Sequence, residues 1–280
     1  MDPSAIEARE RLGELASRAE EDLDLAEGAL LLSREEYPGL DIGHYLASLD
    51  AMADTLLHRL SSCADPASLA RSLNAFLYDE KGFTGNHQSY YDPRNSFLNE
   101  VLDRRLGIPI TLATVYMEVA RRIGLELEGI GLPGHFLLRH TGKGAHFYID
   151  AFAGGAFLTA DDCREKIAEI FNDSVSFKEE FLEPVTKLQI LKRMLHNLKA
   201  IYIHREDFKK ALSVCDRILV IDPEATWELR DRGLLYFRLE CFRSALRDLS
   251  LYIDLRPGAE DAQAVKGRIQ QLTHLVKMIN

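Results

Sequence analysis

A repeated pattern in the last third of the chain restricts its fold more than any other feature. Four pairs of identical residues lie 34 positions apart: Leu195 and Leu229, Tyr202 and Tyr236, Ala211 and Ala245, and Pro223 and Pro257. Such a period indicates a duplicated helical unit, which buries its apolar side only by stacking on a neighbour. The sequence therefore predicts a helical repeat module over residues 185–280, in which residues 260–279 form a capping helix.

The two units, residues 192–225 and 226–259, resemble tetratricopeptide repeats. The resemblance implies that Ala211 and Ala245 let paired helices approach and that a proline ends each unit. The units differ at the position occupied by Lys199 in the first and Gly233 in the second, where a small residue is usual. Because two units are fewer than the roughly three that usually stand alone, we expect the repeats to pack against the rest of the chain.

Charge is divided unevenly between the two parts of the chain. The whole chain carries −10, whereas residues 187–280 hold 17 Lys and Arg against 12 Asp and Glu, a net of +5, which leaves −15 for residues 1–186. Opposite signs favour docking of tethered parts, although salt screens surface charges. The overall acidity argues against a general nucleic-acid binder.

Cysteine usage and hydropathy indicate the compartment. The four cysteines form no CxxC motif, and the acidic N-terminus lacks the basic start and apolar stretch of a signal peptide. No uncharged apolar run approaches the ~20 residues that span a bilayer. The sequence therefore predicts a cytoplasmic protein with no membrane partner and no structural disulfides.

The first 92 residues show mainly helical periodicity. Apolar residues at three- and four-residue steps predict one acidic helix over residues 4–32, and further helices are expected over residues 42–59 and 66–78. Pro66 after Asp65 is typical of a helix start. The glycine-, polar- and aromatic-rich residues 79–92 predict a surface loop.

A different pattern follows, in which a buried helix precedes strands. A short helix is expected to end at Gly107, and the helix from Pro109 to Gly124 is apolar around most of its circumference. Over residues 125–159 apolar residues alternate, which predicts a small antiparallel sheet. The predicted fold class is α+β, with residues 1–184 forming one domain and residues 185–280 the repeats.

The residues Thr141-Gly-Lys-Gly144 predict the turn of a hairpin in that sheet. If the turn centres there, paired positions sum to 285 and His135 lies opposite Asp150. An aspartate beside an imidazole fixes its tautomer and stabilises the protonated ring, as in nucleophilic hydrolases and acyl transferases. The alternative is a surface cross-strand pair without a catalytic role.

The stretch NSFLNEVLDRRLGIPITLATVYMEVARRIGL, followed by GIGLPGHFLLRH and YIDAF, resembles the transglutaminase-like (papain-like) core. Its amino-acid sequence resembles that of the SirB-type bacterial family, in which that core precedes tetratricopeptide repeats. The resemblance implies a cysteine at the start of the central helix, a histidine on one strand and an aspartate on the next. His135 and Asp150 match the last two, but Pro109 stands at the nucleophile position.

Two other residues are candidate nucleophiles. Thr111 lies two residues beyond Pro109, where a hydroxyl also caps a helix. Cys163 follows the capping-box sequence Thr159-Ala-Asp-Asp162, so its thiol falls in the first helical turn, where the helix dipole lowers a thiol pKa. The alternative for Cys163 is a small buried helix residue.

A polar segment precedes the central helix. Asn95, Ser96, Asn99 and Arg104, together with His135, are candidates to line a pocket for a peptide or a small polar ligand. The alternative is that Asp92 and Asn95 cap a helix while Arg104 and its neighbour face solvent or an acidic partner.

No cofactor or metal is expected. GIGLPG at 129–134 has the spacing of a dinucleotide-binding loop, but a strand follows it where a helix is required. In the predicted register His140 and His146 lie near the turn, too far from His135 to share a metal ion.

These observations favour a non-catalytic regulator or scaffold that uses a degenerate acyl-transferase fold to bind a protein or peptide. The resemblance implies a role in bacterial regulation. The rival is an amide or ester hydrolase or an acyl transferase in which His135 and Asp150 activate Cys163, Thr111 or a water. A third possibility is a chaperone-like adaptor that acts through its repeats alone.

Overall fold

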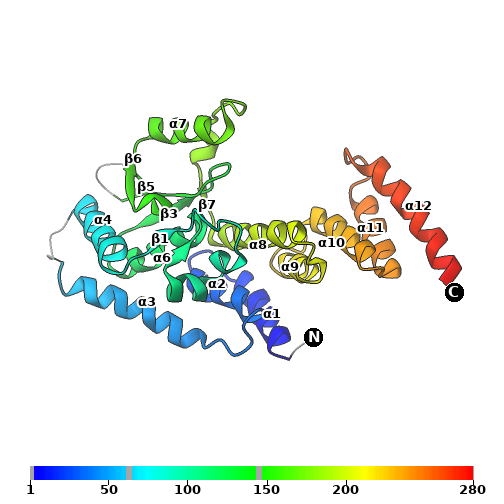
Figure 1. Cartoon of the computed structure of the whole chain (residues 1–280), viewed down its shortest axis with the longest axis horizontal. Helices are drawn as coiled ribbons and strands as arrows, with labels where there is room; N and C mark the ends of the chain where they lie inside the picture. The colour runs from blue at the N-terminus through cyan, green and yellow to red at the C-terminus, as the bar shows by residue number, and fades with distance from the viewer. Residues whose placement is uncertain (1–2, 61–64, 143–146, 280) are drawn as a thin grey trace. The chain divides into compact units, whose positions relative to one another are not determined.

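The computed structural model describes residues 3–60, 65–142 and 147–279, and the chain divides into two compact units, residues 1–194 and 195–280. The first unit begins with helices and continues into a sheet with further helices around it (Figure 1). The helices of its first half are α1 (Pro3–Ala16), α2 (Leu25–Arg34), α3 (Ile42–Leu57), α4 (Pro66–Asn74), α5 (Leu98–Arg104) and α6 (Pro109–Arg122). Short turns η1 (Ala75–Glu80) and η2 (Pro93–Ser96) lie between α4 and α5.

The single helix predicted over residues 4–32 is wrong, because the chain breaks into α1 and α2. Asp24 ends the break: its carboxylate accepts a hydrogen bond of 2.8 Å from the backbone N–H of Glu27 and caps α2. The two helices pack against each other and bury Leu12, Leu15 and Leu30. A folded-back pair buries both apolar faces, which one straight helix on the surface does not do.

The predicted α+β fold class is confirmed, with an antiparallel sheet of five strands in the order β6-β5-β4-β3-β7. The strands are β3 (Leu127–Ile130), β4 (Leu137–His140), β5 (Tyr148–Asp150), β6 (Ala156–Leu158) and β7 (Pro184–Val185). The predicted buried helix is α6, which packs against β3, β4 and η3 (Ala151–Ala153). The helix α7 (Ala160–Phe171) packs its buried residues against β3 and β4.

The hairpin register predicted from the sequence is wrong by two residues. Leu138 pairs with Ile149 and Arg139 with Tyr148, so paired positions sum to 287, and Leu137 falls opposite Asp150. The backbone N–H of His140 donates to the carbonyl of Phe147, which continues the same pairing. Lys143 and Gly144 of the predicted turn lie outside the described residues, as do His146 and Cys63. A shift of two leaves the side-chain alternation unchanged, which keeps His135 on the face of the sheet that Asp150 shares.

A second, two-stranded parallel sheet brings the predicted loop to the start of α6. It pairs β1 (Thr84–Gly85) with β2 (Leu106–Gly107), and Gly85 lies opposite Gly107. The loop predicted over residues 79–92 is irregular only in part, because it contains the end of η1 and the strand β1. The expected helix over 66–78 ends earlier: α4 ends at Asn74, and the π-helical turn η1 follows. The start of α6 is therefore held beside residues 84–87.

The second unit contains the repeats, which begin within α8. Its helices are α8 (Lys187–His204), α9 (Phe208–Ile221), α10 (Thr226–Arg238), α11 (Phe242–Leu255) and α12 (Ala262–Ile279). The first of them, α8, begins in the first unit, and α12 corresponds to the helix predicted over residues 260–279. Ala211 and Ala245 are fully buried, and a Cβ at Gly233 would lie 2.8 Å from the Leu249 side chain. The small residues at these positions thus let the helices of each unit pack closely.

Lys199 occupies the position where a small residue is usual in such repeats. Its long side chain is buried there and forms ion pairs. Its ammonium lies 2.6 Å from Glu228 and 2.8 Å from Asp231, both on α10. Burial lowers the Lys199 pKa, but the two carboxylates outweigh burial and the net pKa is raised. The first repeat therefore replaces an apolar helix contact with a buried ionic one.

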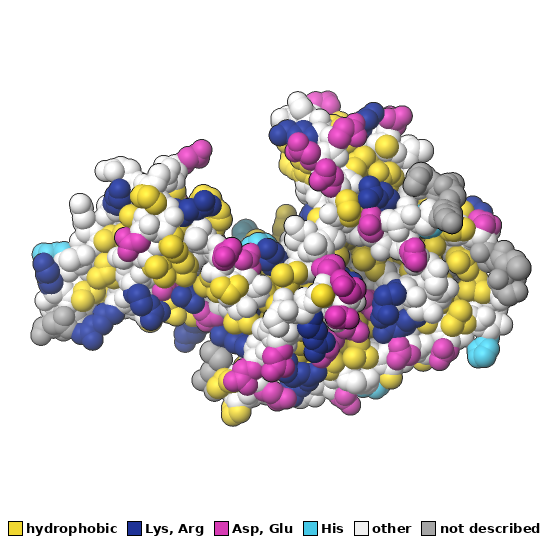
Figure 2. Space-filling model, turned by 180° about the vertical axis from the view of Figure 1, so that it is seen from behind, with side chains coloured by type: hydrophobic (Ala, Val, Ile, Leu, Met, Phe, Trp, Pro, Cys, Tyr) yellow, Lys and Arg dark blue, Asp and Glu magenta, His cyan; other side chains and the backbone are white. Residues whose placement is uncertain are grey.

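The surface mixes both charges with hydrophobic side chains. Figure 2 shows hydrophobic side chains exposed among basic and acidic ones. In the repeat unit, Trp227, Leu251 and Leu255 are 43–53% exposed. Within the described ranges, none of the helices has the length and apolar character needed to cross a bilayer.

Candidate functional site: a buried His–Asp–Lys cluster

A tight turn places His135 just before the start of β4, the middle strand of the sheet. Gly134 has a φ of +70°, and a Cβ there would lie 2.8 Å from the Ile170 side chain on α7, so the position favours glycine. The Arg193 guanidinium donates hydrogen bonds to the carbonyls of Leu132 (2.8 Å) and His135 (2.6 Å). The backbone on both sides of the turn is thereby fixed, and the His135 side chain is 9% exposed.

Asp150, at the end of β5, is the acceptor on which the cluster converges. Its Oδ2 lies 2.8 Å from His135 Nε2 and 3.0 Å from Lys166 Nζ on α7. Its Oδ1 accepts hydrogen bonds from the backbone N–H groups of Phe152 (3.0 Å) and Ala153 (3.2 Å), which caps η3. One carboxylate thus ties together the sheet, η3, the His135 turn and α7.

These contacts define the protonation of the pair. Burial raises the pKa of the Asp150 carboxyl, but the hydrogen bonds and charges of His135 and Lys166 outweigh burial, so the net pKa is lowered. An ionised carboxylate only accepts, so His135 carries a proton on Nε2. In a neutral ring Nδ1 is then the basic atom, and in the described part of the chain it has no hydrogen-bond partner.

The Phe152 ring packs beside His135 and joins it to two further rings. The Phe152 ring centroid lies 6.2 Å from that of His135, 4.4 Å from that of His87 and 6.1 Å from that of Tyr90. Phe152 packs directly on Gly85, where a Cβ would lie 2.6 Å from the ring. Because Gly85 pairs with Gly107, these contacts connect the start of α6 to the His135 ring through Phe152.

No nucleophilic side chain stands at the start of α6. Pro109 is the first helical residue and is buried between Ile108 and Ile110. The Thr111 hydroxyl is fully buried, lies 2.7 Å from the carbonyl of Asn95 and 3.1 Å from the backbone N–H of Ile108, and closes a capping box. Thr111 is therefore a capping residue whose hydroxyl is already engaged in hydrogen bonds.

Cys163 packs in the core between α7 and the sheet. The capping box of Thr159 and Asp162 is present and places the thiol in the first turn of α7. The residue is fully buried with Ile130, Leu137 and other apolar side chains. Burial raises its pKa to about 11, and the charges of Asp162 and Asp150 add to this effect. At neutral pH the thiol is protonated and inaccessible.

The predicted ligand residues Asn95, Ser96, Asn99 and Arg104 lie on η2 and α5. The Asn95 side chain is saturated: it donates to the carbonyls of Ser89 and Tyr90 and accepts from the amide of Asn86. Ser96 Oγ, Asn99 Oδ1 and Arg104 Nη1 are buried and have no hydrogen-bond partner among the described residues. Asp92 caps η2, as the alternative interpretation expected.

His135 is linked to this polar segment only indirectly. Its ring contacts Phe152, which contacts Tyr90. The Asn95 side chain donates to the Tyr90 carbonyl, and Arg104 Nη2 lies 3.5 Å from Asn95 Oδ1. None of the hydrogen bonds or ion pairs of the described residues joins His135 directly to Asn95, Ser96, Asn99 or Arg104.

Three residues of the site were not predicted from the sequence. Lys166, Phe152 and Arg193 come from three different elements and reach the His–Asp pair only through tertiary packing. Phe152 lies within the YIDAF motif, which is the one clue that the sequence offers.

Metal binding finds no support in the described ranges, where no three His, Cys, Asp or Glu side chains are grouped to hold an ion. The His140 ring stacks on Phe147, with centroids 5.0 Å apart.

Comparisons with known proteins agree with this architecture. The family model of the transglutaminase-like superfamily matches residues 43–196, and a tetratricopeptide-repeat model matches residues 198–270. A UPF0162 protein of Xylella fastidiosa is 37% identical over 267 residues, covering 93% of this chain and 94% of the relative. A UPF0162 protein of Vibrio cholerae is 30% identical, covering 90% of this chain and 93% of the relative, and protein SirB1 of Salmonella typhimurium is 27% identical, covering 89% and 93%. The chain therefore belongs to the transglutaminase-like superfamily, in the group that includes the UPF0162 proteins and SirB1.

Proposed function

We propose that the chain is a non-catalytic transglutaminase-like protein that acts as a regulator or scaffold by binding a protein or peptide partner. The observation that carries this proposal is Pro109 at the first position of α6, between buried Ile108 and Ile110. Acyl transfer through a covalent intermediate requires a nucleophilic side chain, and proline has none.

Neither alternative nucleophile replaces the missing one. The Thr111 hydroxyl is buried in hydrogen bonds with backbone groups at the helix start. Cys163 is fully buried, and its pKa is raised to about 11. A reactive thiol needs partial exposure and a lowered pKa, so Cys163 has the opposite properties.

Lys166 further separates this cluster from a catalytic pair. In a catalytic pair the aspartate stabilises the imidazolium that forms during proton transfer. Here the Lys166 ammonium, 3.0 Å from Asp150 Oδ2, already neutralises much of the carboxylate charge. The arrangement fits a structural cross-link among the sheet, η3 and α7 better than a general base.

The segment after β1 supplies a surface for a partner. Tyr91 is 69% exposed, His87 is exposed, and Tyr90 and Phe152 are half-buried. The saturated Asn95 amide fixes the backbone under these rings. A rigid aromatic surface loses little conformational entropy on binding, which favours recognition of a peptide segment.

A second candidate is hydrolysis by an activated water. It is favoured by one observation: His135 Nε2 is held by Asp150, while Nδ1 has no partner in the part of the chain that the structure describes. A water on Nδ1 gives a general base without a side-chain nucleophile.

Two measurements test the proposal. Wild-type protein and His135→Ala are incubated with glutamine-containing peptides and an amine donor, and with activated amide and ester substrates. We expect neither crosslinking nor hydrolysis above the His135→Ala background. Hydrolysis that His135→Ala abolishes would instead establish the second candidate, and crosslinking would contradict both.

The binding arm uses a photocrosslinking amino acid at Tyr91, with Ile170 as the control position because it is also exposed. We expect one partner to be captured from Tyr91 and not from Ile170. The same partner, purified, is then expected to lose at least fivefold in affinity for His87→Ala. Equal capture at both positions, or unchanged affinity, would contradict the proposed surface.

A further inference from the structure

Trp227, the only tryptophan in the chain, is 46% exposed at the start of α10. Tryptophan has the largest apolar surface of any side chain, and half-exposed rings of this kind are enriched where proteins bind partners. The exposure is not due to an irregular element, because Trp227 is the second residue of a regular helix that packs on α9 and α11.

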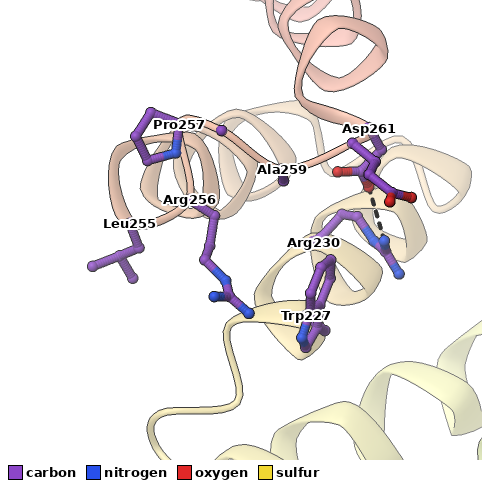
Figure 3. A pocket seen from close by; sticks show the side chains of 9 residues that line it. Trp227, Arg230, Leu255, Arg256, Pro257, Ala259 and Asp261 are labelled. Atoms are coloured by element: carbon purple, nitrogen blue, oxygen red, sulfur yellow. Dashed lines mark hydrogen bonds and ion pairs between the residues drawn. The ribbon is translucent and has the colours of Figure 1, made fainter.

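A cavity of about 630 Å³ opens beside this ring. It is formed by the start of α10 and the connection between α11 and α12, as Figure 3 shows, and its lining includes Trp227, Arg230, Leu255, Arg256 and Pro257. All of these residues belong to the repeat unit. The volume lies in the range of sites that hold a small ligand or a few peptide side chains.

The two arginines of the cavity have different surroundings. Arg230 is held by two carboxylates: its guanidinium lies 2.8 Å from Asp261 and 2.7 Å from Asp231. Arg256 is exposed and stacks on Trp227, 4.8 Å from the ring centroid, and it has no carboxylate partner among the described residues. Arg256 is thus a positioned cation whose hydrogen-bond donors are available to a ligand.

The acids of the cavity limit which anion fits. Asp261 is occupied by Arg230 and by the Tyr252 hydroxyl at 2.7 Å, while the exposed Glu260 also lines the cavity. A dianion such as a phosphate would be repelled by these carboxylates more strongly than a single carboxylate. The apolar surface of Trp227, Leu255 and Pro257 beside Arg256 favours an apolar group next to that carboxylate.

We propose that this cavity binds an acidic peptide segment of a partner protein, in which an Asp or Glu side chain pairs with Arg256 and a neighbouring leucine-like side chain contacts Trp227. The planar guanidinium offers two parallel N–H donors to a carboxylate, and its stacking on the indole keeps it oriented. The site lies on the helix-start edge of α10, and it does not depend on the function proposed for the core.

The single tryptophan makes the test direct, because its fluorescence reports on the cavity alone. The probe is the blocked peptide acetyl-Leu-Glu-Leu-Leu-amide, compared with the same peptide carrying Gln in place of Glu, at 0.15 M salt. We expect a saturable change in fluorescence with the Glu peptide and an affinity lower by about fivefold or more for the Gln peptide.

Two charge-matched variants localise the effect. Arg256→Gln is expected to bring the Glu peptide down to the affinity of the Gln peptide. Arg243→Gln removes the same charge from the opposite end of α11, roughly 20 Å away, and is expected to change nothing. Circular dichroism of both variants checks that they are folded.

Three results would overturn the proposal: no saturable change with the Glu peptide up to millimolar concentration, equal affinity for the Glu and Gln peptides, or an equal loss in Arg243→Gln and Arg256→Gln. The last result would show a diffuse attraction to the basic repeat unit instead of a site.

Discussion

Glu228→Gln is expected to reduce the stability of the repeat unit in a strongly pH-dependent way. The Glu228 side chain is 5% exposed, and its carboxylate lies 2.6 Å from Lys199 Nζ and 3.0 Å from His196 Nε2. Burial raises its pKa, but the hydrogen bonds and charges of His196 and Lys199 outweigh burial. The net effect lowers the Glu228 pKa from 4.5 to about 2.

The size of the effect follows from this difference. A carboxyl that titrates near 2 when folded and at 4.5 when unfolded contributes about 3 kcal/mol to the free energy of unfolding at pH 7. Because the folded pKa is the lower one, the contribution is fully present above pH 4.5 and is lost as the pH falls toward 2. At pH 3 about 1 kcal/mol remains.

Urea unfolding followed by Trp227 fluorescence measures this, since that tryptophan lies in the repeat unit. Glu228→Gln is expected to be less stable than wild type by about 3 kcal/mol at pH 7 and by about 1 kcal/mol at pH 3. Glu224→Gln is the matched control, because Glu224 is exposed on the same unit and forms no ion pair in the described structure. A deficit of the same size at both pH values would refute the reasoning.

Asp150→Ala leaves four donors without an acceptor, so we expect a loss of about 3 kcal/mol in thermal or chemical unfolding; a loss below about 1 kcal/mol would contradict the cross-linking role. Gly134→Ala places a side chain at φ +70° against α7, so we expect the free energy of unfolding to fall by about 1–3 kcal/mol in the same measurement. An unchanged unfolding midpoint would show that the turn does not require glycine. In a Cys63→Ser background, exposed Cys241 should react with a thiol reagent at least about a hundred times faster than buried Cys163; comparable rates in folded protein would restore Cys163 as a candidate nucleophile.

Local patterns in the sequence predicted most of the elements, although residues 4–32 form two helices instead of one. The 34-residue spacing of Tyr202 and Tyr236 predicted paired helices, because each helix must show an apolar face to its neighbour. The almost wholly apolar run after Pro109 predicted a central buried helix, and the alternation in residues 125–159 predicted a small antiparallel sheet. The motif resemblance added the family, which the comparisons confirm.

The register of the hairpin is a feature that such patterns do not determine. Side-chain alternation specifies only which face of a strand is buried, so registers summing to 285 and 287 satisfy it equally. The register that forms depends on the length of the connection between the two strands. That length is decided by how both strands pack in the sheet. His135 and Asp150 meet in either register because diagonal neighbours on one face are within reach of each other.

Contacts between distant elements were decided by the tertiary structure alone. Lys166 reaches Asp150 from α7, and Lys199 reaches Glu228 from α8, although nothing near either lysine in the sequence identifies its partner. The pairing of a buried charge depends on which helix faces lie together, and helical periodicity leaves many such arrangements open. The sequence thus predicted most of the elements and the start of the central helix at Pro109, while packing decided that Asp150 is shared between a histidine and a lysine.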